Sequence, residues 1–343
     1  MNLLDVHNLN IDFAATGRVL PMVSNVSFGI GRGEILALVG ESGCGKSISC
    51  LALTGLLPSP PARVRADRIH FETPSGTVDL ATLPPRRMRR IRGGKIAYVF
   101  QEPSVSLNPV FRVGDQIAEV LELHRPEVAD VRSKVIELLK DVGIPAPETR
   151  IDAFPHEMSG GMQQRVMIAM ALCCNPGLLI ADEPTTALDV TIQAQIISLM
   201  KELQKKMGMS IVLITHDLGV VADIADEIVV MYAGKIVEKG KCRDIFYRRR
   251  HPYTWALLKS VPRVDYEKKQ PLVTIEGGIP DMTNPPKGCA FCQRCPYAMN
   301  ICSEYEPTKT TLADGHEVWC WLLDKRADLS KVPEEIRRRK DEQ

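Results

Sequence analysis

The sequence predicts an α/β protein in which helices cover a mainly parallel sheet, with an antiparallel β subdomain, a helical subdomain and a small cysteine-containing C-terminal domain. Three observations favour this fold class: short apolar runs of strand length, helical patterns between them, and a Pro-rich, Cys-rich texture after about residue 245. The 343 residues exceed the roughly 100–200 of a single domain. The chain is therefore long enough for one large domain and an appendage.

The expected strands are short runs rich in Val, Ile and Leu. They span residues 34–39, 95–100, 178–181 and 210–215. After Asp189, apolar residues from Ile192 to Met207 recur with helical spacing and predict one apolar stripe along a helix. Strands that alternate with such helices favour a parallel sheet. Residues 227–238 differ, because two apolar runs flank a glycine-containing turn in the manner of a hairpin.

The predicted domain boundaries follow changes in composition. The large domain spans residues 1–245, and its helical subdomain spans about 102–172. Residues 56–94 are rich in Pro and Arg and are expected to form solvated loops and a small antiparallel sheet. The cysteine-containing domain spans 246–323, and residues 324–343 form a charged, solvated tail.

The composition is that of an ordinary globular protein. Hydrophobic residues make up 45% and charged residues 25%, and the formal net charge of +1 does not suggest nucleic acid as a partner. The amino terminus lacks the charged flank and apolar stretch of a secretory signal, which predicts a chain that stays inside the cell. The longest uncharged apolar stretch, residues 166–181, is shorter than the ~20 residues that cross a bilayer. A role at a membrane would therefore need a partner.

A phosphate-binding pattern follows the first apolar strand. Residues 40–47, GESGCGKS, fit G-x-x-x-x-G-K-S/T between the strand at 34–39 and a helix that starts near Ser47. The glycines let consecutive N–H groups point at phosphate oxygens, and the helix amino terminus adds a favourable dipole. We expect Lys46 to reach the β- and γ-phosphates and Ser47 to ligate Mg²⁺. The predicted nucleotide contacts are Gly40, Glu41, Ser42, Gly43, Cys44, Gly45, Lys46, Ser47 and Ile48.

Two adjacent carboxylates, Asp182 and Glu183, end the strand expected at 178–181. Alternation along a strand points neighbouring side chains in opposite directions. Asp182 is therefore expected to address the Mg²⁺ shell, while Glu183 faces the water that attacks the γ-phosphate. A strand ending in Asp-Glu is weak evidence alone, and the phosphate-loop pattern strengthens it.

A second glycine-rich helix start lies at residues 159–161. Ser159 is the expected helix cap, and Gly160 and Gly161 permit close approach of the backbone to an anion. Such a motif is more often a simple cap. Because the first loop already holds the phosphates of one nucleotide, this second site makes most sense if it covers the nucleotide of another subunit.

In this order, the segments resemble the ABC ATPase family, where Walker A, a glutamine loop, the signature motif, Walker B, the D-loop and a switch histidine follow one another. The resemblance implies that Gln101 touches Mg²⁺ and links the site to a transmembrane partner. It implies that His216 contacts the γ-phosphate and that Phe13 stacks on adenine, although a core phenylalanine is the alternative for Phe13.

The same resemblance identifies the remaining nucleotide contacts. The signature is implied at Ser159, Gly160, Gly161 and Met162, and the D-loop at Ala187, Leu188 and Asp189. Met162 stands where the general signature has glutamine. Methionine is common there in the peptide-importer branch, so this departure indicates the branch and not a broken site.

The C-terminal cysteines resemble the terminal region of peptide-importer ATPases. That region reads roughly Gly-Cys, then Arg-Cys-Pro, then two further cysteines, and the phrase His-Pro-Tyr-Thr at 251–254 is typical of the same branch. The resemblance implies a 4Fe-4S cluster on Cys289, Cys295, Cys302 and Cys320. Cys292 adds a spacing that alone would suggest either zinc or a ferredoxin-like cluster, and we expect Cys292 to be a fifth, non-ligating thiol. Thiolates suit both iron-sulfur and zinc sites. The alternatives are zinc and unligated thiols.

As a whole, the resemblance implies an ATP-binding and ATP-hydrolysing subunit that powers import of dipeptides or oligopeptides. Its implied partners are a second, usually related ATPase subunit, two transmembrane permease subunits and an extracytoplasmic peptide-binding protein. The implied location is peripheral, at the cytoplasmic face of a bacterial inner membrane. One alternative is the same subunit type for another solute such as nickel. Another is a soluble ABC ATPase acting on nucleic acid, and a third treats the cysteine segment as a redox sensor or electron carrier.

Overall fold

The computed structural model describes residues 2–15, 18–186, 188–260 and 275–337. Contacts divide the chain into two units. The first comprises Met1–Leu4, Gly29–Ile35 and His70–Ile214. The second comprises Asp5–Phe28, Leu36–Ile69 and Thr215–Gln343. The domain boundary predicted after residue 245 lies inside the second unit and stays a prediction.

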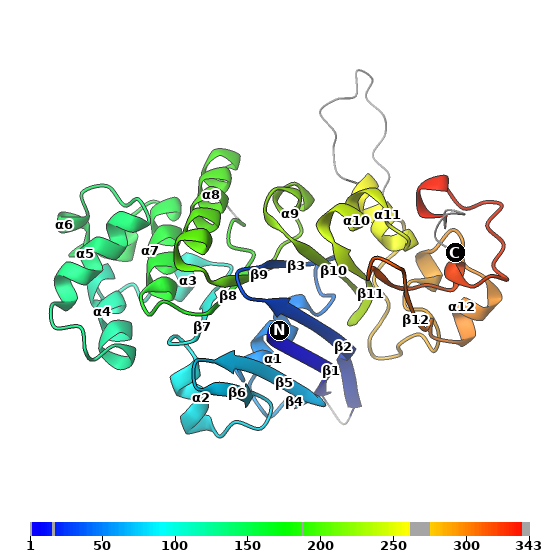
Figure 1. Cartoon of the computed structure of the whole chain (residues 1–343), viewed down its shortest axis with the longest axis horizontal. Helices are drawn as coiled ribbons and strands as arrows, with labels where there is room; N and C mark the ends of the chain where they lie inside the picture. The colour runs from blue at the N-terminus through cyan, green and yellow to red at the C-terminus, as the bar shows by residue number, and fades with distance from the viewer. Residues whose placement is uncertain (1, 16–17, 187, 261–274, 338–343) are drawn as a thin grey trace, which may run out of the picture. The chain divides into compact units, whose positions relative to one another are not determined.

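The described residues form strands, α-helices and short 3₁₀ helices (Figure 1). The strands are β1 (Asn2–Ala15), β2 (Arg18–Gly31), β3 (Ile35–Val39), β4 (Ala62–Arg65), β5 (Arg68–Thr73), β6 (Gly76–Asp79), β7 (Ile96–Val99), β8 (Leu178–Asp182), β9 (Ser210–Ile214), β10 (Glu227–Tyr232), β11 (Lys235–Lys241), β12 (Lys309–Thr311) and β13 (Glu317–Trp319). The helices are α1 (Lys46–Leu53), α2 (Pro85–Ile91), α3 (Pro103–Ser106), α4 (Val113–His124), α5 (Val131–Asp141), α6 (Pro147–Arg150), α7 (Gly160–Leu172), α8 (Val190–Met207), α9 (Leu218–Ile224), α10 (Cys242–Tyr247), α11 (Pro252–Lys259) and α12 (Asn300–Glu304). The 3₁₀ helices are η1 (Pro155–Glu157), η2 (Cys292–Arg294), η3 (Trp321–Leu323) and η4 (Glu334–Ile336).

The first unit contains a parallel sheet in the order β7-β8-β9. Ile180 at the middle of β8 pairs with Tyr98 of β7 and with Val212 of β9. Every residue of β8 and β9 is buried, as expected for parallel strands covered on both faces. The helices α4, α5 and α7 pack on one another, and α7 also contacts β7 (Figure 1). The parallel strands and the helical pattern predicted from the sequence are confirmed.

The second unit contains strands in the order β3-β10-β11-β13-β12. β3 and β10 are parallel, whereas β10 and β11 form the antiparallel hairpin predicted for residues 227–238. Ala233 and Gly234 make its turn with positive φ angles of 45° and 76°. β13 and β12, which come from the C-terminal part, continue this sheet as antiparallel strands.

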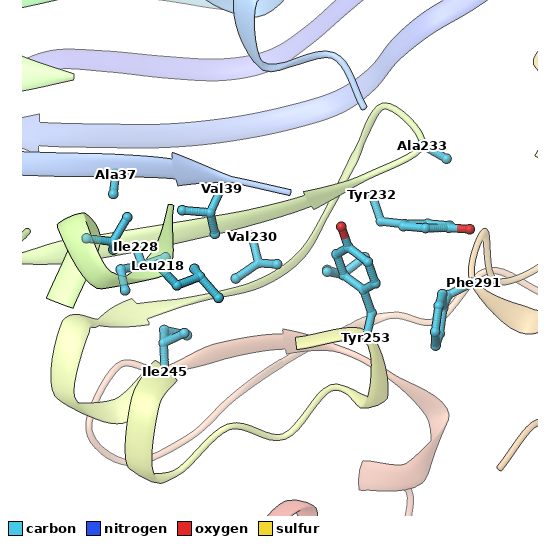
Figure 2. Packing of buried hydrophobic residues seen from close by; sticks show 12 residues of the cluster. Ala37, Val39, Leu218, Ile228, Val230, Tyr232, Ala233, Ile245, Tyr253 and Phe291 are labelled. Carbon is cyan, nitrogen blue, oxygen red and sulfur yellow. The ribbon is translucent and has the colours of Figure 1, made fainter. Parts of the chain in front are cut away.

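A buried cluster holds the second unit together. Figure 2 shows Val39 of β3 and Val230 of β10 packed with Leu218 of α9 and Ile245 of α10. Tyr253 of α11 belongs to the same cluster. So does Phe291, which lies in the cysteine segment, residues 289–302. The cysteine segment therefore packs on a core that the phosphate-loop strand also enters.

The Arg-rich segment 56–94 contains one element that the sequence pattern did not reveal. Its antiparallel strands were predicted, and β5 and β6 form a hairpin in the first unit. The arginines from Arg86 to Arg90, however, lie on helix α2, which starts with Pro85 at its first position. Proline is favoured there because its missing N–H needs no partner. A proline-rich segment can therefore contain a short helix.

The tail predicted as solvated is partly packed. Val332 and Ile336 are each 2% exposed and cluster with Leu322. Their short apolar spacing escapes notice in a charged segment that has no long apolar run. Residues 338–343 of the predicted tail lie outside the described residues. Among the described helices, none has the length and apolar character needed to span a bilayer.

Candidate functional site

The phosphate loop connects β3 to α1 in the second unit, as predicted. Gly40 has a φ of 148°, and a Cβ there would lie 2.2 Å from the carbonyl oxygen of Met231. Gly45 has a φ of 99° and caps α1 without a side-chain hydrogen bond. The first N–H groups of a helix have no partner within the helix, and they favour an anion. Glycine is therefore required here both for the loop path and for an open helix start.

Lys46 folds back over this loop. Its Nζ donates to the carbonyl oxygens of Gly40 at 2.8 Å and Glu41 at 3.0 Å. The residue is 5% exposed, and its ammonium also lies 3.6 Å from the Cys44 Sγ. Burial raises the pKa of the Cys44 thiol, so this thiol stays neutral beside the lysine. The loop thus presents one buried cation.

The other predicted loop residues are graded in exposure. Ser42 and Gly43 are exposed, and Glu41, Ser47 and Ile48 are half-buried. A triphosphate would meet the backbone of the exposed part first. The residues present therefore fit a nucleotide phosphate chain.

His216 follows a residue that is hydrogen-bonded to β3, the strand that leads into the phosphate loop. Thr215 N donates to the carbonyl oxygen of Leu38 on β3, at 3.4 Å, and His216 follows as an exposed residue. Asp217 then caps α9, accepting from Gly219 N at 2.8 Å. His216 is therefore held at the carboxyl end of β3, from which the phosphate loop also starts.

Phe13, the predicted adenine contact, lies on β1 opposite Ala62 of β4. It is half-buried. A ring in this state retains surface for stacking.

Three predicted residues meet in the first unit at the end of β8. Glu183 Oε2 accepts from Gln101 Nε2 at 3.1 Å and from Thr186 Oγ1 at 2.9 Å. Asp182 Oδ2 accepts from Tyr98 OH at 2.9 Å. The structure thus brings together Gln101, Asp182 and Glu183, as expected from their positions at strand ends. Thr186 and Tyr98 are partners that sequence reasoning missed: Tyr98 is a polar group within the strand predicted at 95–100, and Thr186 follows the Asp-Glu pair by three residues.

The two carboxylates are separated by a backbone turn and not by strand alternation. β8 ends at Asp182, and Glu183 has a φ of 45°, in the left-handed region. Its N–H donates to the carbonyl oxygen of Ile214 at 2.9 Å. A non-glycine residue held in this region is strained, and such strain is common at functional sites.

The second glycine-rich helix start is the amino end of α7. Ser159 caps the helix and accepts from Met162 N at 3.4 Å. A Cβ on Gly161 would lie 2.9 Å from Ile192 of α8, whereas one on Gly160 would meet only Leu188, at 3.9 Å. Gly161 is needed for helix packing, and Gly160 leaves the helix start open. The capping role predicted for Ser159 is confirmed.

Asp189 belongs to the same neighbourhood. It caps α8, accepting from Ile192 N at 2.9 Å. Gly161 lies next to Ile192 of α8, and Gly160 lies next to Leu188, the residue before Asp189. The signature and Asp189 are therefore neighbours in the first unit. Ala187, which the resemblance also placed in the D-loop, lies outside the described residues.

The C-terminal cysteines gather in the second unit. Cys289 N donates to the carbonyl oxygen of Cys302 at 2.7 Å. Burial raises the pKa of Cys289 to about 11, that of Cys295 to about 12, and that of Cys320 well above its ordinary value. These side chains are therefore neutral thiols in the structure.

The arrangement of these thiols does not fit a metal or cluster as it stands. Across the described ranges, which include Cys289 to Cys302 and Cys320, no group of three or more His, Cys, Asp or Glu side chains is placed to hold a metal ion. A four-thiolate ligand set would need the sulfur atoms to converge on one centre. Cys173 and Cys174, which an apolar helical run predicts as small core residues, are buried, and so is Cys44 of the phosphate loop.

A glycine-built phosphate loop, a buried lysine folded over it and a strand-terminal Asp-Glu pair define the class: this is a P-loop nucleotide-binding protein. The family model described as ABC transporter matches residues 23–186, and that described as Oligopeptide/dipeptide transporter, C-terminal region, matches residues 237–302. The chain belongs to the ABC transporter ATP-binding family, in its oligopeptide/dipeptide branch.

Similar proteins cover nearly the whole chain. The Oligopeptide transport ATP-binding protein OppD of Bacillus subtilis (strain 168) is 51% identical over 336 residues, which is 98% of this chain and 93% of that protein. The Dipeptide transport ATP-binding protein DppD of Escherichia coli (strain K12) is 46% identical over 321 residues, 93% of this chain and 96% of that protein.

Solved structures agree with the fold. The dimeric ATP-binding cassette MJ0796, in a post-hydrolysis state bound to ADP and Pi, matches with a TM-score of 0.60 and 27% identity. The match covers 70% of this chain and 99% of that one. The fold class predicted from the sequence, an ABC ATPase core, is confirmed, and the chain is an ABC-type ATPase.

Proposed function

We propose that this chain binds and hydrolyses ATP to power the import of dipeptides or oligopeptides through an ABC transporter. The observation that carries the proposal is the Glu183 carboxylate, which Gln101 and Thr186 orient at the end of β8. The relatives named for oligopeptide and dipeptide transport support the substrate class.

Each predicted site residue has a proposed role. The loop from Gly40 to Ile48 and Lys46 bind the triphosphate, and Phe13 stacks on adenine. Ser47, Asp182 and Gln101 would hold Mg²⁺, which shields the phosphate charge. Glu183 orients the attacking water, and His216 contacts the γ-phosphate.

The signature belongs to a composite pocket between two ATPase subunits. In this proposal Ser159, Gly160, Gly161 and Met162 cap the nucleotide of a companion subunit, and Asp189 lines the same junction. The open start of α7 supports this role, because a free helix terminus favours phosphate. The companion is a related ATPase chain.

The remaining partners follow from the family. We propose two transmembrane permease subunits and an extracytoplasmic peptide-binding protein, with this chain peripheral at the cytoplasmic face of a bacterial inner membrane. Co-purification of permease subunits from solubilised membranes is the expected result. Salt-dependent DNA binding without permease capture would favour a nucleic-acid function instead.

Replacing the proposed catalytic carboxylate tests the function directly. Glu183→Gln is expected to retain MgATP binding, to lower turnover about 100-fold or more, and to accumulate an ATP-bound dimer. Phosphate release and light scattering measure these effects. Glu202→Gln on α8 is the matched control, and wild-type turnover is expected for it, because Glu202 is exposed and accepts a hydrogen bond from Ser198 Oγ of the same helix.

Two results would contradict the proposal. Wild-type turnover in Glu183→Gln would remove this residue from catalysis. A wild-type chain without magnesium-dependent nucleotide affinity, or one that binds ATP without forming any dimer, would overturn the composite pocket.

A 4Fe-4S cluster on Cys289, Cys295, Cys302 and Cys320 stays a prediction, with Zn²⁺ as the alternative. Its support is the resemblance of the cysteine pattern, and ligation would require the thiols to deprotonate and converge. Anaerobic purification followed by iron, sulfide and zinc analysis decides between them. One zinc per chain without iron would exclude the cluster.

A further inference from the structure

The carboxylate of Glu41 turns away from the lysine of its own loop and toward the C-terminal part. Arg294 donates from Nη1 to Glu41 Oε2 at 2.7 Å and from Nη2 to Oε1 at 3.0 Å. The side chain of Arg294 is 5% exposed and that of Glu41 28%. This is a two-bond, parallel pair, the strongest geometry for an arginine and a carboxylate. The phosphate-loop pattern itself leaves this position open to any residue.

The guanidinium of Arg294 is fully engaged. Besides the two bonds to Glu41, Nη1 donates to Tyr232 OH at 3.2 Å, Nη2 to the carbonyl oxygen of Ile275 at 2.9 Å, and Nε to that of Glu276 at 3.0 Å. These five bonds match the five N–H donors of an arginine. The planar group therefore has one orientation in which all donors are satisfied, and it holds Glu41 in a defined place.

The backbone of Glu41 is held from the same side. Its N–H donates to Tyr253 OH at 2.8 Å. Tyr253 is fully buried and packs against Tyr232 and Phe291 (Figure 2). The centroid of its ring lies 4.7 Å from the ring centroid of Tyr232 and 5.4 Å from that of Phe291. Phe291 precedes Arg294 by three residues, so the aromatic cluster and the ion pair attach the same cysteine segment to the loop.

The third group of Glu41 reaches the lysine. Its carbonyl oxygen accepts from Lys46 Nζ at 3.0 Å. The N–H, the carboxylate and the carbonyl of one residue thus connect Tyr253, Arg294 and Lys46. A shift of Glu41 would move the acceptor that aims the lysine ammonium.

We propose that Arg294 is a positioning residue for ATP: through Glu41 it holds the phosphate loop in the conformation that receives the triphosphate. This inference rests on the proposed nucleotide site.

A double-mutant cycle tests the proposal. The variants are Glu41→Gln, Arg294→Gln and the two combined, and the measurement is the Kd for MgATP by calorimetry. Each single change is expected to weaken binding about tenfold, because the bidentate pair is lost, and the combined change is expected to weaken it no further. Arg294→Lys keeps the charge without the fork geometry and is expected to restore only part of the affinity.

The control is Arg326→Gln, in the same unit. Arg326 forms an exposed pair with Asp324, two residues earlier in the chain, so wild-type affinity is expected. Steady-state kinetics provides a second readout. Loss of positioning raises the KM for ATP while kcat changes little, whereas a merely structural defect lowers the amount of active protein and leaves KM unchanged.

The outcomes separate the two proposals. A wild-type chain that does not bind MgATP contradicts the proposed function. The role of Arg294 is overturned if the wild-type chain binds MgATP and the single variants bind it as tightly as the wild type does. It is also overturned if the losses of the two single variants add up in the combined variant. If Arg294→Gln does not fold, Glu41→Gln and Arg294→Lys still decide, because Glu41 is half-buried in a loop and lysine retains the charge.

Discussion

At the residue scale, the phosphate loop is held by contacts within one contiguous motif, such as Lys46 with Gly40, and by contacts from distant residues, such as Arg294 with Glu41. Residues 40–47 form one short pattern, so their loop and the roles of their glycines follow from the sequence. The Arg294–Glu41 pair joins residues 253 positions apart, and no local spacing announces it. Sequence alternation also failed at Glu183, because a left-handed backbone turn separates it from Asp182.

Gly40 offers a test of the loop path. A Cβ at this position would lie 2.2 Å from the carbonyl oxygen of Met231, which is backbone and cannot rotate away. Gly40→Ala is therefore expected to destabilise the fold and to abolish MgATP binding.

The comparison variant is Gly33→Ala. Gly33 also has a positive φ, of 70°, but no atom lies within 4 Å of an added Cβ, so a loss of only about 1–2 kcal/mol is expected in urea unfolding. Equal losses for the two alanine variants would show that the close approach at Gly40 is unimportant.

At the element scale, a helix was predictable where its apolar stripe was long. A helix was not predictable where packing against other elements or a capping residue determines that it forms. α8 follows its periodicity from Ile192 onward, and Asp189, which the resemblance placed in the D-loop, caps its start. α2 escaped detection because four of its seven residues are Arg and its apolar residues are too few to show a stripe. α11 begins with an unusual cap, since His251 Nδ1 accepts from Tyr253 N at 3.1 Å.

This histidine cap makes the free energy of unfolding depend on pH, and the sign of the dependence follows from the pKa of His251. Burial lowers the pKa of His251 from 6.5 to about 4, with Glu238 opposing the shift in part. The unfolded chain therefore binds the proton first as the pH falls, so stability decreases between pH 6.5 and 4 and is unaffected above pH 6.5. The shift corresponds to at most about 3 kcal/mol.

Urea unfolding at pH 7, 6, 5 and 4.5 measures this effect. His251→Asn can still cap the helix but does not titrate, so a shallower decline in stability is expected for it. The same decline in both proteins would assign the pH dependence to other groups.

At the scale of the whole molecule, the sheet order depends on contacts between distant parts of the chain. β13 pairs with β11 through Val318 and Glu317, although only three residues form that strand. Strands this short carry too little periodicity to be predicted. The packed part of the C-terminal tail was also missed, because Val332 and Ile336 are isolated apolar residues in a charged segment and pack against residues from other parts of the chain, such as Leu322 and Trp255.

The packed tail can be tested by a cavity-forming substitution. Ile336 is 2% exposed, so Ile336→Ala is expected to reduce the free energy of unfolding by about 2–5 kcal/mol. Lys331→Ala, at an exposed position nearby, is expected to change it by less than about 0.5 kcal/mol. Thermal and urea unfolding measure both. A solvated tail would make the two variants indistinguishable.

The pairing of β11 with β13 has a consequence for the growing polypeptide. Once Lys241 has emerged from the ribosome, β11 can form its hairpin with β10, but the strand that covers its other edge starts only at Glu317. An uncovered edge is a template for pairing with other chains. Nascent chains on a polysome would therefore be prone to aggregate between the emergence of Lys241 and that of Glu317, and a chaperone that shields β11 would be useful in that interval.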